Sequence, residues 1–93
     1  MAKIRLNLLN IFALRVKKHS LEYDGDTVGQ VLSQFFAEHK QSLQDLWVDK
    51  DEHGSPQHLL ILLNGRVIPH SVIYQAPLIS GDKITLSFPL SGG

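Results

Sequence analysis

The chain has 93 residues, which suits one small domain with a single hydrophobic core. It contains no cysteine, which excludes a disulfide framework, a thiolate metal site and a thiol nucleophile. Nine lysine and arginine residues balance nine aspartate and glutamate residues, so the basic footprint of a protein that binds nucleic acid or an anionic membrane is missing. We therefore expect protein partners, with no nucleic acid and no membrane.

The first quarter of the chain predicts two strands. Polar and apolar residues alternate across residues 3–8, as in a half-buried strand, and a second short strand fits residues 18–23. Residues 11–16 between them are too apolar for a simple hairpin turn, and we expect a tucked loop there. Asn7 and Asn10 interrupt the apolar run, and no small-residue cleavage site follows it, so we expect no signal peptide and a cytoplasmic protein.

The next stretch predicts the main helix. Thr27-Val28-Gly29-Gln30 has the Thr-x-x-Gln form of a capping box, in which two side chains bind free N–H groups at the start of a helix. Apolar residues then recur at helical spacing, and we expect a helix over residues 27–40 whose apolar stripe covers a sheet. A helix that binds a partner through this stripe is the alternative. Residues 41–46 fit a second short helical turn.

Residues 47–58 are mostly polar, and we interpret them as a solvated loop. Their acidic residues lack the ligand spacing of a calcium-binding loop. The five histidines of the chain are scattered, without a pair at helical spacing and without a cysteine to join them. We therefore expect no metal and no cofactor.

The second half of the chain predicts a hairpin and a final strand. Asn64-Gly65 favours the type I′ turn of a two-residue hairpin, here within residues 59–68. One face of the apolar run before the turn joins the core, and the other is either covered locally or displayed to a partner. Residues 71–74 fit a single turn, Ser80-Gly81-Asp82 a second turn, and residues 83–88 an alternating strand. The expected order is strand, strand, helix, strand, strand, strand.

The last residues predict an extended tail. Pro89 cannot donate a hydrogen bond to a sheet and should end the pairing, so we assign residues 1–88 to one domain and residues 89–93 to a flexible tail. Gly92 and Gly93 lack a Cβ atom, so this backbone can lie in a narrow channel of another protein, with the Gly93 carboxylate unhindered for attack on a phosphate. A frayed end or the remnant of a cloning linker is the alternative.

This order of elements, followed by a diglycine, resembles the ubiquitin-like β-grasp fold, an α+β fold in which one main helix covers a mixed sheet of four to five strands. Three motifs resemble its sulfur-carrier branch more narrowly. They are Leu63-Asn64-Gly65-Arg66, Gly81-Asp82 and the ending Phe88-Pro89-Leu90-Ser91-Gly92-Gly93. That branch includes the thiamine-biosynthesis sulfur carrier and the small subunit of molybdopterin synthase, and the ending is most similar to the molybdopterin type.

The resemblance implies a carrier rather than an enzyme. By implication, an ATP-dependent, E1-like activating enzyme adenylates the Gly93 carboxylate, and sulfide or the persulfide of a sulfurtransferase converts it to a thiocarboxylate. The tail residues Pro89, Leu90, Ser91 and Gly92 would then enter a channel in the large synthase subunit or in another sulfur-acceptor enzyme. The most similar pathway is molybdopterin biosynthesis, which serves molybdenum and tungsten cofactors.

Several alternatives stay open. The same tail would serve a carrier for thiamine, for another sulfur metabolite or for tRNA thiolation. The adenylated glycine could instead be joined to lysine amines, as in a ubiquitin-like modifier, and a β-grasp interaction module would need no tail chemistry.

Similarity to ubiquitin further implies which side chains near the hairpin face a partner. It places Ile61, Leu63 and Ile68 toward the core. Leu60 and Leu62 then face outward as a partner-binding surface, unless residues 47–58 cover them.

Overall fold

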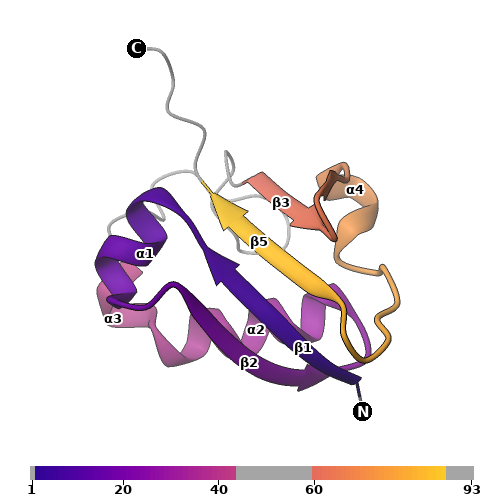
Figure 1. Cartoon of the computed structure of the whole chain (residues 1–93), viewed down its shortest axis with the longest axis horizontal. Coiled ribbons are helices and arrows are strands. Elements are labelled where there is room, and N and C mark those ends of the chain that lie inside the picture. The colour runs from indigo at the N-terminus through magenta and orange to yellow at the C-terminus, as the bar shows by residue number, and fades with distance from the viewer. Residues whose placement is uncertain (1, 44–59, 88–93) are drawn as a thin grey trace.

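A computed structural model describes residues 2–43 and 60–87 of the chain. Its elements are, in chain order, β1 (Ala2–Leu8), α1 (Asn10–Val16), β2 (Ser20–Gly25), α2 (Val28–Glu38), α3 (Lys40–Leu43), β3 (Leu60–Leu63), β4 (Arg66–Val67), α4 (His70–Ile73) and β5 (Lys83–Ser87). The strands form one five-stranded sheet in the order β2-β1-β5-β3-β4. In Figure 1, α2 passes behind β1 and β5, so the viewer looks at the face of the sheet that α2 leaves open. The expected loop at residues 47–58 and tail at residues 89–93 lie outside the described residues.

The expected α+β class, with a mixed sheet and one main helix, is confirmed. β1 pairs with β5 in parallel and with β2 in antiparallel orientation, while β3 pairs with β5 and β4 in antiparallel orientation. Because successive strand residues point to opposite faces, the apolar half of each central strand faces α2. All eight residues predicted to form the core are at most 1% exposed: Ile4, Leu6, Leu8, Val31, Leu32, Phe35, Ile84 and Leu86.

Residues 11–16 do not form the loop expected from the sequence, because Asn10–Val16 fold into α1. Phe12 is fully buried, and its ring centroid lies 6.4 Å from that of Phe35. Lys17 ends the helix in the left-handed conformation, with φ of 65°, and its N–H donates to the Ala13 carbonyl at 2.9 Å. The prediction was wrong because so short a helix depends on a tertiary contact, here the burial of Phe12, more than on its own periodicity.

α2 begins where the capping box predicts. Thr27 Oγ1 accepts a hydrogen bond from the Gln30 N–H at 3.3 Å. Gln30 Oε1 accepts in turn from the Asp26 N–H at 2.7 Å, one residue before the position that a regular capping box uses. The helix ends at Glu38 rather than at residue 40. The short helical turn expected over residues 41–46 begins one residue earlier, as α3, and residues 44–46 lie outside the described residues.

The predicted hairpin and later turns are confirmed. Asn64 and Gly65 have φ angles of 52° and 83°, both left-handed, as a type I′ turn between β3 and β4 requires. α4 forms the expected turn, and Ile73 on it is fully buried. Gly81, with φ of 96°, then turns the chain into β5.

We expect Phe35→Ala to lower the free energy of unfolding by about 3–5 kcal/mol, because it empties a site in contact with the rings of Phe12 and Phe36. Urea denaturation measures this change. Ser33→Ala, on the exposed side of the same helix, is the control and should change stability by less than about 0.5 kcal/mol. A Phe35→Ala midpoint equal to that of the control would contradict the placement of Phe35 at the centre of the core.

Candidate functional site

β5 leads to the predicted tail, and it is held on both sides along its length. Leu86 lies opposite Leu8 of β1, and its carbonyl accepts a hydrogen bond from the Leu9 N–H at 3.0 Å. On the other side, Ser87 lies opposite Leu60 of β3. Figure 1 shows this end of β5 between the two neighbouring strands. The chain beyond Ser87 therefore starts from a point that two strands fix.

Hydrogen bonds between two turns fix the other end of β5. Asn64 Nδ2 donates to Asp82 Oδ1 at 3.0 Å, and Asn64 Oδ1 accepts from the Lys83 N–H at 2.9 Å. Asp82 Oδ2 accepts from the Ile79 N–H at 2.9 Å, and the Asn64 N–H donates to the Lys83 carbonyl at 2.8 Å. The Asn-Gly and Gly-Asp motifs, which are far apart in the sequence, thus meet and set the register of β5 against β3.

The inward and outward side chains of β3 lie as expected. Ile61 is 1% exposed, and Leu63 and Ile68 pack against the core. Leu60 and Leu62 alternate with them and therefore point to the open face, where both are half-buried. Their placement agrees with the expected partner-binding surface, and their role in binding stays a prediction.

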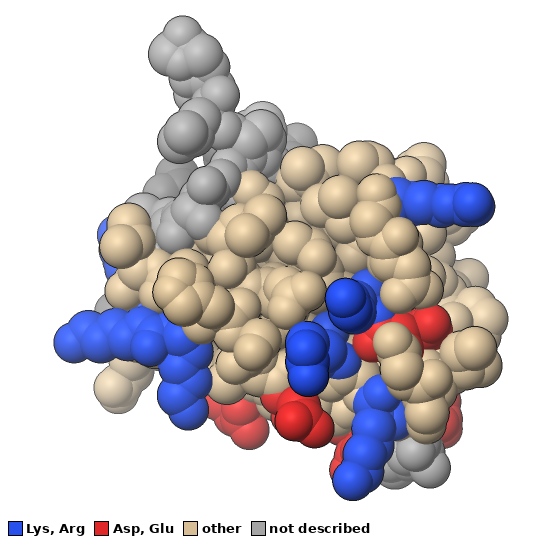
Figure 2. Space-filling model, viewed as in Figure 1, with Lys and Arg blue, Asp and Glu red and all other residues tan. Residues whose placement is uncertain are grey.

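The open face next to these leucines is uncharged. Leu62 lies opposite Thr85 of β5 on one side and Val67 of β4 on the other, and Val67 is 63% exposed. Figure 2 shows an uncharged area over β3 and the second half of β5. An apolar surface with an open rim is the kind of area that protein interfaces bury.

The first halves of the central strands carry a basic stripe on the same face. Arg5 of β1 lies opposite Lys83 of β5, and Lys3 lies two residues away from Arg5. On the other side, Glu22 and Asp24 of β2 lie opposite Arg5 and Lys3. A partner that covers β3 and β5 would therefore fit best with an apolar patch beside an acidic one.

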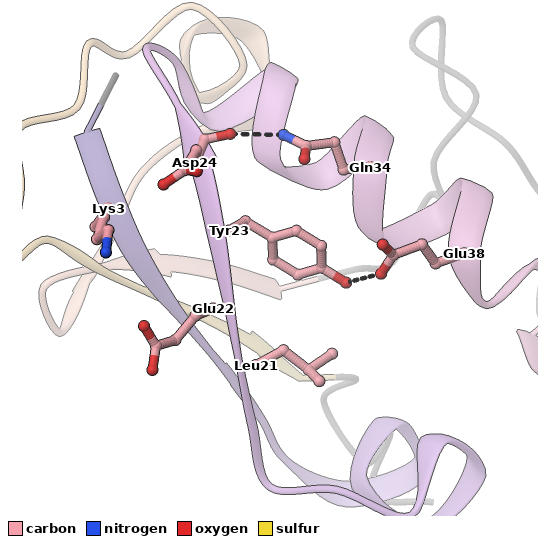
Figure 3. A pocket seen from close by; sticks show the side chains of 7 residues that line it. All are labelled: Lys3, Leu21, Glu22, Tyr23, Asp24, Gln34 and Glu38. Carbon is pink, nitrogen blue, oxygen red and sulfur yellow. Dashed lines mark hydrogen bonds between the residues drawn. The ribbon is translucent and has the colours of Figure 1, made fainter.

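A groove of about 410 Å³ lies along β2, at the edge of the sheet away from β3 and β4. Figure 3 shows two hydrogen bonds that join β2 to α2 there. The Tyr23 hydroxyl donates to Glu38 Oε1 at 2.6 Å, and Gln34 Nε2 donates to the Asp24 carbonyl at 2.7 Å. Burial, together with the Glu38 carboxylate, raises the pKa of Tyr23 well above its usual value. Tyr23 therefore keeps its proton at neutral pH and acts as a hydrogen-bond donor to the helix.

Within residues 2–43 and 60–87, no three histidine, cysteine, aspartate or glutamate side chains come together to hold a metal ion. None of the helices in these two ranges is long and apolar enough to cross a membrane. The tail residues predicted to carry the chemistry, Pro89, Leu90, Ser91, Gly92 and Gly93, lie outside the described residues, and their roles stay predictions. Sequence reasoning missed the bonds between Asn64 and Asp82, although both belong to the motifs that it singled out.

Comparison with known proteins finds similarity in the fold. No protein-family model matches the chain, and no curated protein matches it. The solution structure of small archaeal modifier protein 1 from Methanosarcina acetivorans is 24% identical to it, with a TM-score of 0.80 over 100% of this chain and 98% of that one. The chain therefore has the ubiquitin-like β-grasp fold expected from its sequence.

Two further matches are chains of protein complexes. One is in the BexX/CysO complex of Amycolatopsis orientalis, with 18% identity and a TM-score of 0.73 over 97% of this chain and 99% of that one. The other is in the complex of subunits 1 and 2 of molybdopterin-converting factor from Helicobacter pylori, with 21% identity and a TM-score of 0.61 over 98% of this chain and 99% of that one. The resemblance to ubiquitin-like sulfur carriers is thus confirmed at the level of the fold.

We expect the double variant Leu60→Ser, Leu62→Ser to weaken binding to the activating enzyme that the resemblance implies by at least about tenfold, because it removes two apolar side chains from the open face. Titration calorimetry measures the affinity, and the unfolding midpoint checks the fold. Val72→Ser, at an exposed apolar residue of α4, is the matched control and should leave the affinity unchanged. Equal affinities for the double variant and wild type would exclude this part of the surface from the contact.

We also expect Asn64→Ala to lower the free energy of unfolding by about 1–3 kcal/mol, because it removes side-chain hydrogen bonds and puts a Cβ-bearing residue without a polar side chain at positive φ. Asn64→Gly separates the two effects, since glycine accepts this φ but makes no side-chain bond. Asn64→Gly should lower the free energy of unfolding by a measurable amount, but by less than Asn64→Ala does. An Asn64→Gly chain as stable as wild type would show that the bonds to Asp82 and Lys83 contribute nothing.

Proposed function

We propose that this chain is a sulfur carrier whose Gly93 carboxylate is activated and loaded with sulfur by partner enzymes. One observation carries the proposal most directly. The chain matches, over nearly its full length, the fold of proteins named modifier, CysO and molybdopterin-converting factor, and its sequence places Gly92-Gly93 a few residues after the strand that ends this fold.

The proposed chemistry begins with activation, because a carboxylate is a poor electrophile at neutral pH. An oxygen of the Gly93 carboxylate attacks the α-phosphorus of ATP and displaces pyrophosphate, giving an acyl adenylate. Hydrosulfide then attacks the acyl carbon, and AMP leaves with the electron pair of the broken C–O bond. If an enzyme persulfide attacks instead, the product is an acyl disulfide, and a second thiol reduces it to release the thiocarboxylate.

The chain itself contributes shape to this reaction rather than acid, base or nucleophile. β5 sets where the tail begins, and the bare backbone of Gly92 suits a narrow channel. The open face of β3 and β5 would bind the E1-like activating enzyme first and the acceptor later. The two partners would therefore use the same surface one after the other. The complexes in which the matched CysO and molybdopterin-converting factor chains occur support such protein partners.

The acceptor that we favour is the large subunit of a molybdopterin synthase, because the ending Phe-Pro-Leu-Ser-Gly-Gly resembles that type. Transfer to a thiamine precursor, another sulfur metabolite or tRNA would use the same loaded tail. Conjugation to protein lysines is the second candidate, and the match to small archaeal modifier protein 1 favours it. In that case a lysine amine, instead of sulfide, displaces AMP and forms an amide.

Adding one residue after Gly93 tests the proposal, because the reacting carboxylate is then moved beyond the position that the channel sets. We expect pyrophosphate exchange into ATP by the activating enzyme to fall to the background rate. Gly92→Ala should also lower the exchange rate, since a Cβ would obstruct the channel and restrict the backbone.

A chain with one residue added before Met1 is the matched control, with equal length and an unchanged tail. It should support exchange as wild type does, and all the variants should unfold at the same urea concentration. Exchange by the C-terminally extended chain at the wild-type rate would contradict the assignment of Gly93.

A further inference from the structure

β2 is an edge strand whose outward main-chain groups are largely free. The Leu8 N–H donates to the His19 carbonyl at 2.8 Å, so alternate residues from His19 onward direct their main-chain groups toward β1. Ser20, Glu22 and Asp24 therefore direct theirs away from the sheet. Free N–H and C=O groups in a row are a template for another strand.

One described contact confirms that the main-chain groups of Asp24 point away from the sheet, and it also occupies one of them. Gln34 Nε2 bonds the Asp24 carbonyl from outside the sheet at 2.7 Å. No described residue takes up the outward groups of Ser20 and Glu22. Four main-chain groups at the middle of the edge are thus available to a partner strand.

The charges of this segment are separated by sign along the chain. Lys17 and Lys18 precede β2, whereas Glu22, Asp24 and Asp26 lie within it or follow it. An edge strand whose charges all had the same sign would repel the same strand of a second copy. An edge with opposite signs in its two halves is complementary to a copy that runs antiparallel to it, because the basic half of each then meets the acidic half of the other.

We propose that two copies of this chain pair through β2 in antiparallel orientation and join their sheets into one. In the register that the charges favour, Leu21 lies opposite Leu21 of the second copy at the two-fold axis. Ser20 then lies opposite Glu22 of the second copy, and Lys18 opposite Asp24 of the second copy. The two Ser20–Glu22 pairs make four main-chain hydrogen bonds, and each Lys18–Asp24 pair joins opposite charges on the open face.

Neighbouring registers are less favourable. Placing the axis at Glu22 would set this carboxylate directly opposite its copy, which is destabilising. A further shift in the same direction brings Glu22 opposite Asp24 of the second copy. A shift the other way would set Glu22 opposite Lys18 of the second copy, but it leaves Ser20 opposite itself and shortens the paired segment.

The groove beside β2 has room for the helix-side residues of a second strand. Seven residues from β1, β2 and α2 line it (Figure 3): Lys3, Leu21, Glu22, Tyr23, Asp24, Gln34 and Glu38. In the proposed register, Leu21 and His19 of the second copy would lie over this groove. Pairing would therefore cover the partly exposed side chain of Leu21 as well as main-chain groups.

This contact leaves the surface that we propose for the partners of the tail uncovered. β2 is separated from β3 by β1 and β5, so a second copy at β2 does not cover Leu60 or Leu62. The other sheet edge, β4, has only two residues and carries Arg66 without an acidic neighbour in the strand. The pairing proposal therefore stands or fails independently of sulfur transfer.

Sedimentation equilibrium of the full chain tests the proposal. A contact confined to one strand is smaller than a standard interface, so we expect a dimer with a dissociation constant of about 10 μM to 1 mM. Lys18→Glu and Asp24→Lys each replace two attractive pairs with two repulsive ones, and each should weaken the dimer at least about tenfold. An equimolar mixture of the two variants should dimerise like wild type, because both pairs of the mixed dimer are attractive, one with its charges exchanged and one as in wild type.

Arg66→Glu on the opposite edge is the matched control and should leave dimerisation unchanged. Amide exchange of wild type gives a second readout, in which the Ser20 and Glu22 N–H groups gain protection as concentration rises, even if a variant fails to fold. A wild-type chain that stays monomeric at about 1 mM overturns the proposal and leaves this edge to a strand of a different protein. Dimers that persist in both single variants, or a mixture that fails to pair, overturn it as well.

Discussion

The pairing of β5 with both of its neighbours is the constraint on which the rest of the structure depends. β5 is the last strand in the sequence but lies in the middle of the sheet, parallel to β1 and antiparallel to β3. Ile84 and Leu86 bury its inner face, and the bonds among Asn64, Asp82 and Lys83 fix where it begins. The chain beyond Ser87 therefore starts from a fixed point, which is what the proposed entry of the tail into a partner channel would require.

The sheet separates two kinds of contact. The open face over β3 and the second half of β5 is uncharged and lies beside the end of β5, so it suits the proposed partners, which would bind the domain and the tail together. The edge at β2 offers main-chain groups and a basic block followed by an acidic block, which suit a second copy of the same strand. Because β1 lies between these two surfaces, each can be occupied without covering the other.

Much of the fold follows from periodicity, because one core face selects the register of each strand and of the main helix. The Asn64-Gly65 turn was predictable for a local reason, since few residues accept two successive positive φ angles. Contacts distant in sequence were not predictable. α1 depends on the burial of Phe12, the link from Asn64 to Asp82 spans two turns, and Gly29 is required where an added Cβ would lie 2.8 Å from the Tyr74 carbonyl oxygen. The tail stays a prediction, and it rests on chemistry and resemblance, which periodicity alone does not supply.

The most direct test of the central claim is the intact mass of the chain after incubation with ATP, magnesium, the cognate activating enzyme and a sulfur source. A sulfur carrier gains the mass difference of one oxygen replaced by one sulfur, and fragmentation places that change at Gly93. An unchanged mass, or a chain found only in amide linkage to lysines of other proteins, would contradict the sulfur-carrier account.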